Sequence, residues 1–268
     1  MPELAEVQTV REVLKKQILN KKINDIKILY DRIIENDINF FKDNLINNKF
    51  IDIKRRGKYL IFETENNYLI SHLRMEGKYF IKGYEDKIEK HEHIVFYFDD
   101  FTLRYHDTRK FGRMILIKKN ELEDYFKNLG PDANTYNDYE KLYTIIKNKK
   151  LPIKSILLDQ SILAGLGNIY VDEVLFASNI NPLKIGMNIT KEEVKNILES
   201  SNRILEKAII EKGCTIRSYT SSLGVKGNYQ NFLMVHTKEG LPCPTCNTTI
   251  EKTRVGGRGT YFCPKCQK

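Results

Sequence analysis

Four cysteines near the C-terminus are the feature that most constrains how this 268-residue chain can fold. They form two Cys-x2-Cys pairs with 16 residues between them: Cys243, Cys246, Cys263 and Cys266. Two such pairs bring four thiolates within reach of one tetrahedral zinc ion, so a short segment can fold around metal instead of a hydrophobic core. The alternatives are a purely structural ribbon or two disulfide bonds in a secreted protein. We expect zinc, because the chain begins Met-Pro-Glu-Leu-Ala-Glu-Val and not with an apolar signal segment.

The segment between the two cysteine pairs is basic and rich in glycine. It contains Lys252, Arg254, Gly256, Gly257, Arg258 and Gly259. Such a segment suits contact with a phosphate backbone. Cys214 is left over, and we expect an ordinary, partly buried thiol there.

The charge of the whole chain points in the same direction. The sequence has 44 Lys and Arg against 35 Asp and Glu, a formal net charge of +9 and a pI of about 9.1. It has no apolar run of membrane-spanning length. Nucleic acid is therefore a better expected partner than a membrane. A coding bias toward Lys, Asn and Ile would also raise the net charge. The charge alone therefore does not identify the partner, and the sequence motifs are needed to do so.

The first part of the chain predicts an antiparallel β-sandwich behind an N-terminal helix. Val7, Val10, Leu14 and Ile18 recur at helical spacing within residues 3–19. The runs rich in β-branched and aromatic residues that follow predict strands over residues 23–30, 50–53, 59–63, 68–73, 93–98, 102–105 and 114–117.

The pattern changes after Gly130-Pro131. Helices are predicted over residues 140–146, 153–159, 168–177 and 191–210, and a long polar loop over residues 212–230. The length of the chain fits two domains. We therefore expect an α+β protein with a catalytic β-sandwich domain in residues 1–131, a helical domain in residues 132–238 and a zinc finger in residues 239–268.

Pro2 is a candidate nucleophile. It follows the initiator Met1 directly, and a small second residue permits removal of Met1. The exposed secondary amine would be partly unprotonated at neutral pH, since an α-amine titrates near about 7.7–8.0, and could form an iminium with an electrophilic carbon. Glu3, or Glu6 on the same helical face, could serve as general acid or base. The alternative is structural, because proline and acidic residues are favoured in a first helical turn.

The N-terminal sequence resembles the start of the formamidopyrimidine-DNA glycosylases, bifunctional base-excision repair enzymes that remove oxidised purines. Further motifs occur in that family's order along the whole chain: Arg55-Arg56-Gly57-Lys58-Tyr59-Leu60, His72-Leu73-Arg74-Met75-Glu76-Gly77, Lys90-His91-Glu92-His93, Asp107-Thr108-Arg109-Lys110-Phe111-Gly112, Gly165-Leu166-Gly167-Asn168-Ile169-Tyr170, and the cysteine finger with Arg258. Ala5 departs from the family, which usually has a second proline there.

The resemblance implies catalytic roles for individual residues. Pro2 would attack C1′ of the damaged nucleotide, and Glu3 would assist opening of the sugar. Lys58 would contact phosphate near the lesion and assist elimination, although by itself it also fits a solvated surface lysine. Arg258 would bind phosphate beside the lesion and take part in a second elimination, with Arg254 as an auxiliary charge.

The resemblance also implies residues that contact DNA. Met75, Arg109 and Phe111 match residues that fill the void left by a flipped base. The alternative is that Met75 and Phe111 belong to the core and that Arg109 contacts phosphate. Residues 165–168 match the turn of a helix–two-turns–helix clamp, in which Asn168 begins a helix whose amides attract an anion. His91 and Lys150 match further DNA contacts, and residues 215–229 match the loop that encloses the flipped base.

Two other functions compete with this interpretation. An endonuclease VIII-type glycosylase shares the fold and chemistry but prefers oxidised pyrimidines, and it usually carries Gly where Leu4 stands. A non-catalytic zinc protein that binds DNA would not need Pro2, Glu3 and Lys58. The resemblance favours a glycosylase and AP lyase for oxidised purines in double-stranded DNA. We expect a cytoplasmic monomer with one structural zinc ion and no membrane partner.

Overall fold

Two four-stranded antiparallel sheets form the first half of the protein. The computed structural model describes residues 1–214 and 226–268. One sheet has the order β1 (Asp25–Ile28), β6 (Glu92–Tyr97), β7 (Thr102–His106) and β5 (Lys78–Lys82). The other has the order β2 (Asp52–Arg56), β3 (Tyr59–Glu63), β4 (Asn67–His72) and β8 (Arg113–Lys118). The predicted antiparallel sheets are confirmed.

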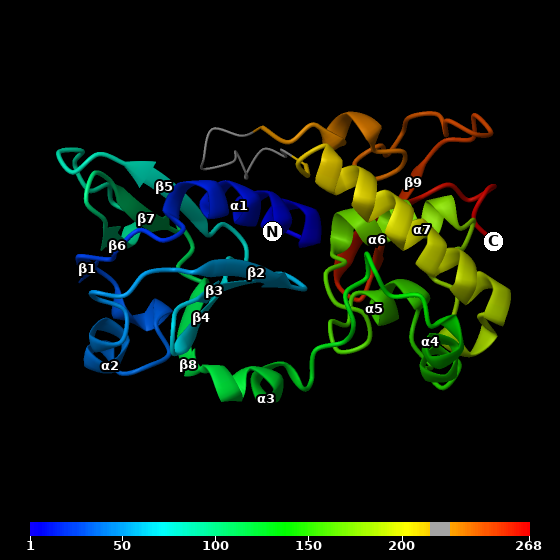
Figure 1. Ribbon diagram of the computed structural model, residues 1–268. Helices are drawn as coiled ribbons and strands as arrows, with labels where there is room; N and C mark the ends of the chain where they lie inside the picture. The colour runs from blue at the N-terminus through cyan, green and yellow to red at the C-terminus, as the bar shows by residue number, and fades with distance from the viewer. Residues whose placement is uncertain (215–225) are drawn as a thin grey trace. The chain divides into compact units, whose positions relative to one another are not determined.

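The N-terminal helix α1 (Leu4–Ile18) packs against β2 and β3 (Figure 1). The four positions predicted from helical spacing, Val7, Val10, Leu14 and Ile18, are all buried. They join a core that includes Phe41, Phe62 and Tyr79. Full burial of one such side chain stabilises a fold by about 1.5–3 kcal/mol, so this face anchors the helix firmly. The residues at its start, Pro2 and Glu3, are thereby held on a rigid element.

Short elements complete this half of the chain. They are η1 (Asp31–Ile33), α2 (Ile38–Asp43), η2 (Lys119–Glu121) and α3 (Leu122–Phe126). Strand β5, α2 and α3 were not predicted. Each has only five or six residues, and β5 has a lysine at both ends, so periodicity gives little signal. Antiparallel pairing with β7 stabilises β5 as a strand, although its own sequence does not predict one.

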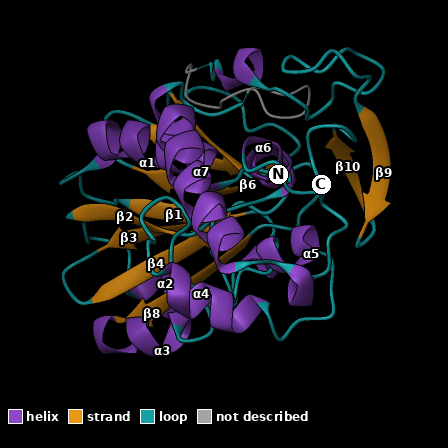
Figure 2. Ribbon diagram, turned by 90° about the vertical axis from the view of Figure 1, so that its right-hand side faces the viewer, coloured by secondary structure: helices purple, strands orange, loops and turns teal. Residues whose placement is uncertain are grey.

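The second half is helical and ends in a hairpin. Its helices are α4 (Tyr139–Ile146), α5 (Ile153–Leu157), α6 (Asn168–Ala177) and α7 (Lys191–Ile210), with the short turns η3 (Gly186–Asn188) and η4 (Tyr229–Phe232). Thr190 caps α7 through a reciprocal pair with Glu193. Strands β9 (Glu251–Val255) and β10 (Arg258–Phe262) form an antiparallel hairpin near the C-terminus (Figure 2).

The chain forms two compact units. One comprises residues 1–127 and 212–227, and the other residues 128–211 and 228–268. Residues 212–214 and 226–227 therefore belong to the unit that contains the sheets. The three-part division at residues 131 and 238 stays a prediction. No helix among the described residues has the length and apolar character needed to cross a membrane.

Candidate active site and zinc centre

The start of α1 is closed by a reciprocal pair of glutamates. Glu3 is the N-cap residue, and its side chain accepts from the backbone amide of Glu6. In return, Oε2 of Glu6 accepts from the backbone amide of Glu3 at 2.8 Å. The other oxygen, Oε1, accepts from the amide of Cys214 at 2.7 Å. This capping box fixes the backbone next to Pro2.

Charged groups gather around the N-terminal amine. Burial lowers the pKa of the α-amine at Met1 below its ordinary value of 8.0, Glu3 and Glu6 raise it, and Lys58 lowers it again. Since all three charges act on one amine, the structure brings together Glu3 and Lys58 at the chain start. Pro2 itself is buried, and its nitrogen is an amide nitrogen while Met1 precedes it.

Lys58 lies in the turn between β2 and β3. Gly57 adopts φ 54° there, a left-handed conformation that glycine adopts without strain. The guanidinium of Arg55 donates from Nη1 to the carbonyl oxygen of Gly57 at 3.0 Å and fixes the turn. Lys58 is only 5% exposed. It is therefore not a solvated surface lysine.

Met75, Arg109 and Phe111 lie on two loops of the first unit. Phe111 is 48% exposed, and the guanidinium carbon of Arg109 lies 4.7 Å from the centre of its ring. Arg109 is exposed and Met75 is half-buried. A half-exposed aromatic ring beside a guanidinium is not a core position, and both groups can stack on a base.

His91 lies just before β6 and is half-buried. Its ring centre is 5.7 Å from that of His106 and 6.4 Å from that of His93. Burial lowers the pKa values of His93 and His106, so both are neutral at physiological pH. The carbonyl oxygen of His91 accepts from the amide of Asp107 at 3.0 Å, which connects it to the loop of Phe111.

Two candidate DNA contacts belong to the second unit. Lys150 is exposed between α4 and α5. Asn168 is the first residue of α6, and Gly167 is the N-cap. The side chain of Asn168 donates from Nδ2 to the carbonyl oxygen of Gly259 at 3.0 Å, so it contacts the hairpin. Its assignment as a DNA contact stays a prediction.

The turns before α6 are held by one side chain. Oε1 of Gln160 accepts from the amide of Gly165 at 3.0 Å, and Nε2 donates to the carbonyl oxygen of Leu166 at 2.9 Å. Gly165 has φ 103°, which L side chains rarely adopt. The tight connection between α5 and α6 therefore depends on glycine at this position.

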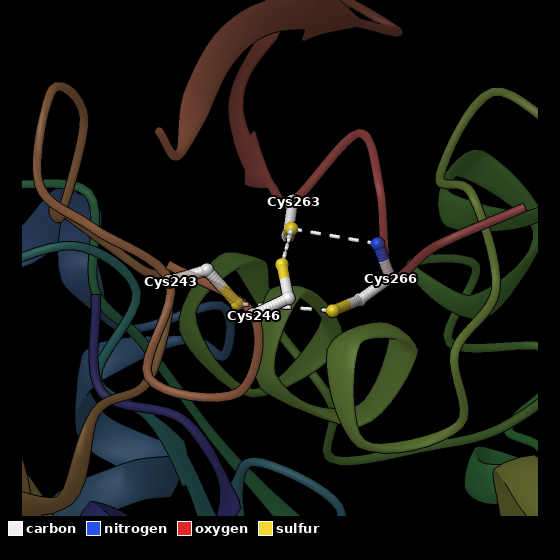
Figure 3. A group of neighbouring side chains, drawn as sticks. All are labelled: Cys243, Cys246, Cys263 and Cys266. Carbon is white, nitrogen blue, oxygen red and sulfur yellow. Dashed lines mark hydrogen bonds between the residues drawn. The ribbon is translucent and has the colours of Figure 1, made fainter. Parts of the chain in front are cut away.

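The four C-terminal cysteines converge on one point (Figure 3). Their sulfur atoms all lie within 4.8 Å of one another, with Cys243 and Cys266 at 3.8 Å and Cys246 and Cys263 at 3.4 Å. Zinc–sulfur bonds of about 2.3 Å in a tetrahedron place sulfurs about 3.8 Å apart. The cluster fits one zinc ion, as predicted.

The thiols of this cluster do not ionise alike. Hydrogen bonds from Thr248 lower the pKa of Cys246 to about 6. The contact with Cys246, together with burial, raises the pKa of Cys266 to about 12, and burial also raises that of Cys263. Four sulfurs this close cannot all become thiolates unless a cation compensates their charge. A bound zinc ion supplies that charge.

The basic finger between the cysteine pairs is a β-hairpin. Gly256 and Gly257, with φ 55° and 76°, form its two-residue turn. Arg258 follows directly, pairs in register with Val255, and is exposed. The turn thus presents the guanidinium of Arg258 on a defined strand.

A buried polar network in the second unit was not predicted. Asp172 on α6 meets Nζ of Lys154 and Nδ1 of His236, each at 2.7 Å. Glu173 accepts from three successive backbone amides of residues 234–236 at 2.8–3.0 Å. In the sequence, the signal for this network was the pair of acidic residues within the otherwise apolar stretch of α6.

The loop expected to enclose the flipped base covers residues 215–229. Residues 215–225 of it lie outside the described residues.

Comparisons with known proteins cover the whole chain. The model of the formamidopyrimidine-DNA glycosylase N-terminal domain matches residues 1–114, the model of its H2TH domain matches residues 129–220, and the model of a zinc finger found in FPG and IleRS matches residues 240–268. The formamidopyrimidine-DNA glycosylase of Streptococcus pneumoniae is 44% identical over 272 residues, covering 100% of this chain and 99% of the relative. That of Mycoplasma genitalium is 44% identical over 273 residues, covering 100% and 96%.

Solved structures agree with these sequence matches. A complex of a Lactococcus lactis FPG mutant with Fapy-dG containing DNA has a TM-score of 0.96 at 41% identity, covering 100% of both chains. A complex of Lactococcus lactis Fpg with DNA containing an abasic site has a TM-score of 0.95 at 42% identity, covering 99% of both chains.

Proposed function

Since this chain belongs to the formamidopyrimidine-DNA glycosylase family, we propose that it excises oxidised purines from double-stranded DNA through the amine of Pro2. The protein is a base-excision repair DNA glycosylase and AP lyase with one structural zinc ion. The observation that carries our assignment of residues is the gathering of Glu3, Glu6 and Lys58 around the N-terminal amine.

The first step begins once Met1 has been removed. The lone pair of the Pro2 nitrogen, no longer delocalised in an amide, attacks C1′ of the damaged nucleotide. The bond between C1′ and the base breaks, the base leaves with the bonding electrons, and it takes up the proton that the Pro2 nitrogen loses on bonding to C1′. Glu3 donates a proton to the ring oxygen of the sugar, which opens and leaves an iminium between C1′ and Pro2.

Strand cleavage follows from the iminium. Its positive charge acidifies the proton at C2′, and loss of that proton expels the 3′ phosphate. Lys58 binds phosphate near the lesion and assists this elimination. A second elimination, with proton loss at C4′, expels the 5′ phosphate, and Arg258 binds that group.

The base must leave the stack before this chemistry, and the void must be filled. The half-exposed ring of Phe111 and the thioether of Met75 can stack between base pairs, and the guanidinium of Arg109 can hydrogen-bond the orphaned cytosine. His91 and Lys150 contact DNA, and Lys150 does so through a phosphate. Asn168 acts at the start of α6, where backbone amides favour an anion.

We assign the parts of the chain accordingly. Residues 1–131 carry the catalytic chemistry, residues 132–238 bind DNA through the helix–two-turns–helix segment, and residues 239–268 form the zinc finger. We propose that the protein acts as a monomer in the cytoplasm.

Matched duplexes test the proposed lesion class. One contains 8-oxoguanine opposite cytosine, the other an oxidised thymine opposite adenine, in the same sequence, under single-turnover conditions. We expect excision of the purine to be more than about tenfold faster, since one net hydrogen bond to the correct base contributes up to about 1.5 kcal/mol and tenfold corresponds to about 1.4 kcal/mol. Faster excision of the pyrimidine would favour the endonuclease VIII-type specificity. Binding without excision of either base would favour a non-catalytic zinc protein.

A further inference from the structure

We infer that Asp107 and Thr108 are positioning residues that hold two exposed loops together as one preformed wedge for entry into DNA. The Met75 loop comprises residues 74–76, and the Phe111 loop comprises residues 108–111. The inference rests on the proposed function, because it is there that Met75, Arg109 and Phe111 are assigned to the void left by the flipped base. It adds the residues that set their conformation.

Asp107 fixes both ends of the Phe111 loop. Its side chain is fully buried. Oδ1 accepts from the amide of Arg109 at 2.9 Å, and Oδ2 accepts from the amide of Gly112 at 2.8 Å. Its carbonyl oxygen lies 2.8 Å from Nε2 of His93, which donates to it. Asp107 therefore ties the loop to β6 and gives its backbone one defined path.

The far end of the loop presses against β7. A Cβ atom on Gly112 would lie 1.7 Å from the hydroxyl oxygen of the buried Tyr105 side chain, so a larger residue fits only if that side chain or the backbone shifts. Between the two anchored ends, Lys110 has φ 58°, a left-handed conformation that is unfavourable for a lysine. Such a conformation persists where the surrounding contacts determine it. The contacts thus hold the loop in one conformation, in which the ring of Phe111 is half-exposed.

The Met75 loop is anchored in a similar way. Nδ1 of His72 accepts from the amide of Arg74 at 2.9 Å, and Arg74 has φ 51°. Burial, with the charges of Arg74 and Lys58, lowers the pKa of His72 to about 3. The imidazole is therefore neutral at physiological pH and keeps Nδ1 as an acceptor.

A direct contact joins the two loops. The hydroxyl of Thr108 donates to the carboxylate of Glu76. Since Glu76 follows Met75 and Thr108 precedes Arg109, this bond links the backbone segments that carry the inserting side chains. The guanidinium of Arg109 also packs on the Phe111 ring. The entropy of ordering these residues is then lost on folding and not on DNA binding, which favours insertion.

The test uses Thr108→Val, which removes the hydroxyl but keeps the branched shape, and Thr108→Ser as a matched control that keeps it. Asp107→Asn provides a second, buried change, because its amide can accept at one oxygen only. The first readout is affinity for a duplex with a tetrahydrofuran abasic site opposite cytosine. The second is cleavage of single-stranded abasic DNA, which needs no wedge because nothing is stacked opposite the site.

We expect Thr108→Val and Asp107→Asn each to weaken binding of the lesion duplex by about threefold to tenfold, the effect of one lost hydrogen bond. Cleavage of the single strand should be unchanged, and Thr108→Ser should match the wild type. Wild-type binding by both Thr108→Val and Asp107→Asn would overturn the inference. Equal losses on duplex and single strand would also overturn it, because they would show a general effect on the fold.

Phe111→Ala distinguishes failure of this inference from failure of the proposed function. If Phe111→Ala weakens lesion binding while the Asp107 and Thr108 variants do not, insertion stands and the positioning role is wrong. If Phe111→Ala itself leaves lesion binding unchanged, the assignment of the inserting residues is wrong, and the wedge has no function to support.

Discussion

The ammonium group of Lys154 donates to the carboxylate of Asp172 at 2.7 Å, and both side chains are completely buried in the second unit. The same ammonium donates to the carbonyl oxygen of Gly259 at 3.0 Å, next to Arg258. The other oxygen of Asp172 meets Nδ1 of His236. One buried charge pair therefore holds α5 and α6 to the hairpin that carries Arg258.

Replacing Asp172 should destabilise this unit strongly. Asp172→Asn removes the negative charge that faces Lys154, and breaking a buried pair on one side costs about 3–5 kcal/mol in the free energy of unfolding. Urea denaturation measures the loss, and hydrogen exchange should show faster exchange in β9 and β10. Glu140→Gln is the control, since it breaks an exposed pair with Lys191 and should change stability far less. Equal effects of the two substitutions would contradict this account of the pair.

The pKa of His72 predicts a dependence of stability on pH. Burial lowers it from 6.5 to about 3 in the folded protein. As the pH falls below 6.5, the unfolded chain takes up the proton first, so the contribution of His72 is complete above pH 6.5 and is lost toward pH 3. The free energy of unfolding should fall by up to about 1.4 kcal/mol per pH unit from this group.

The variant His72→Asn keeps a hydrogen-bond acceptor but does not titrate. Comparing it with the wild type isolates the contribution of His72 to the pH dependence of stability. Between pH 7 and 5, where carboxylates change little, urea denaturation should give a shallower decline for the variant than for the wild type. The lowered pKa values of His93 and His106 act in the same direction. The free energy of unfolding should therefore still decline with falling pH in the variant as well as in the wild type. Parallel curves for variant and wild type would show that His72 is not kept neutral by the fold.

Local spacing allowed much of this structure to be predicted. The helical periodicity of Val7 to Ile18 gave α1, and the cysteine spacing gave the zinc centre, because each depends on residues close in sequence. The contact of Glu6 with Cys214 spans 208 residues, and that of Lys154 with Gly259 spans 105. No periodicity encodes such contacts, since tertiary packing creates them. The same holds for Asp107, whose role depends on the path of the loop around it.

Zinc removal should affect the second unit selectively. Cys266→Ser removes one ligand, whereas Cys214→Ser changes a buried thiol outside the cluster and serves as the control. We expect one zinc per chain in the wild type and in Cys214→Ser, and loss of zinc together with weaker DNA binding in Cys266→Ser, because metal replaces a core there. Elemental analysis and DNA titration measure both. Active protein without stoichiometric zinc would contradict the assignment.

The assignment of Lys150 predicts a change in salt dependence. Each phosphate contact contributes about one unit to the slope of log affinity against log salt concentration. Lys150→Ala should lower that slope by about one, whereas Lys141→Ala, at an exposed position on α4 without an assigned contact, should leave it unchanged. If both variants keep the wild-type slope, Lys150 does not bind phosphate.

Borohydride trapping followed by mass spectrometry tests the role of Pro2 most directly. Reduction of the imine should join the protein to abasic DNA, and the adduct should map to the N-terminal peptide of chains that have lost Met1. Protein that retains Met1 should bind the same DNA but form no adduct, because its Pro2 nitrogen is an amide nitrogen. Pro2→Gly should keep some trapping, since a primary amine still forms an imine. Full trapping with Met1 retained, or an adduct at Lys58, would contradict Pro2 as the nucleophile.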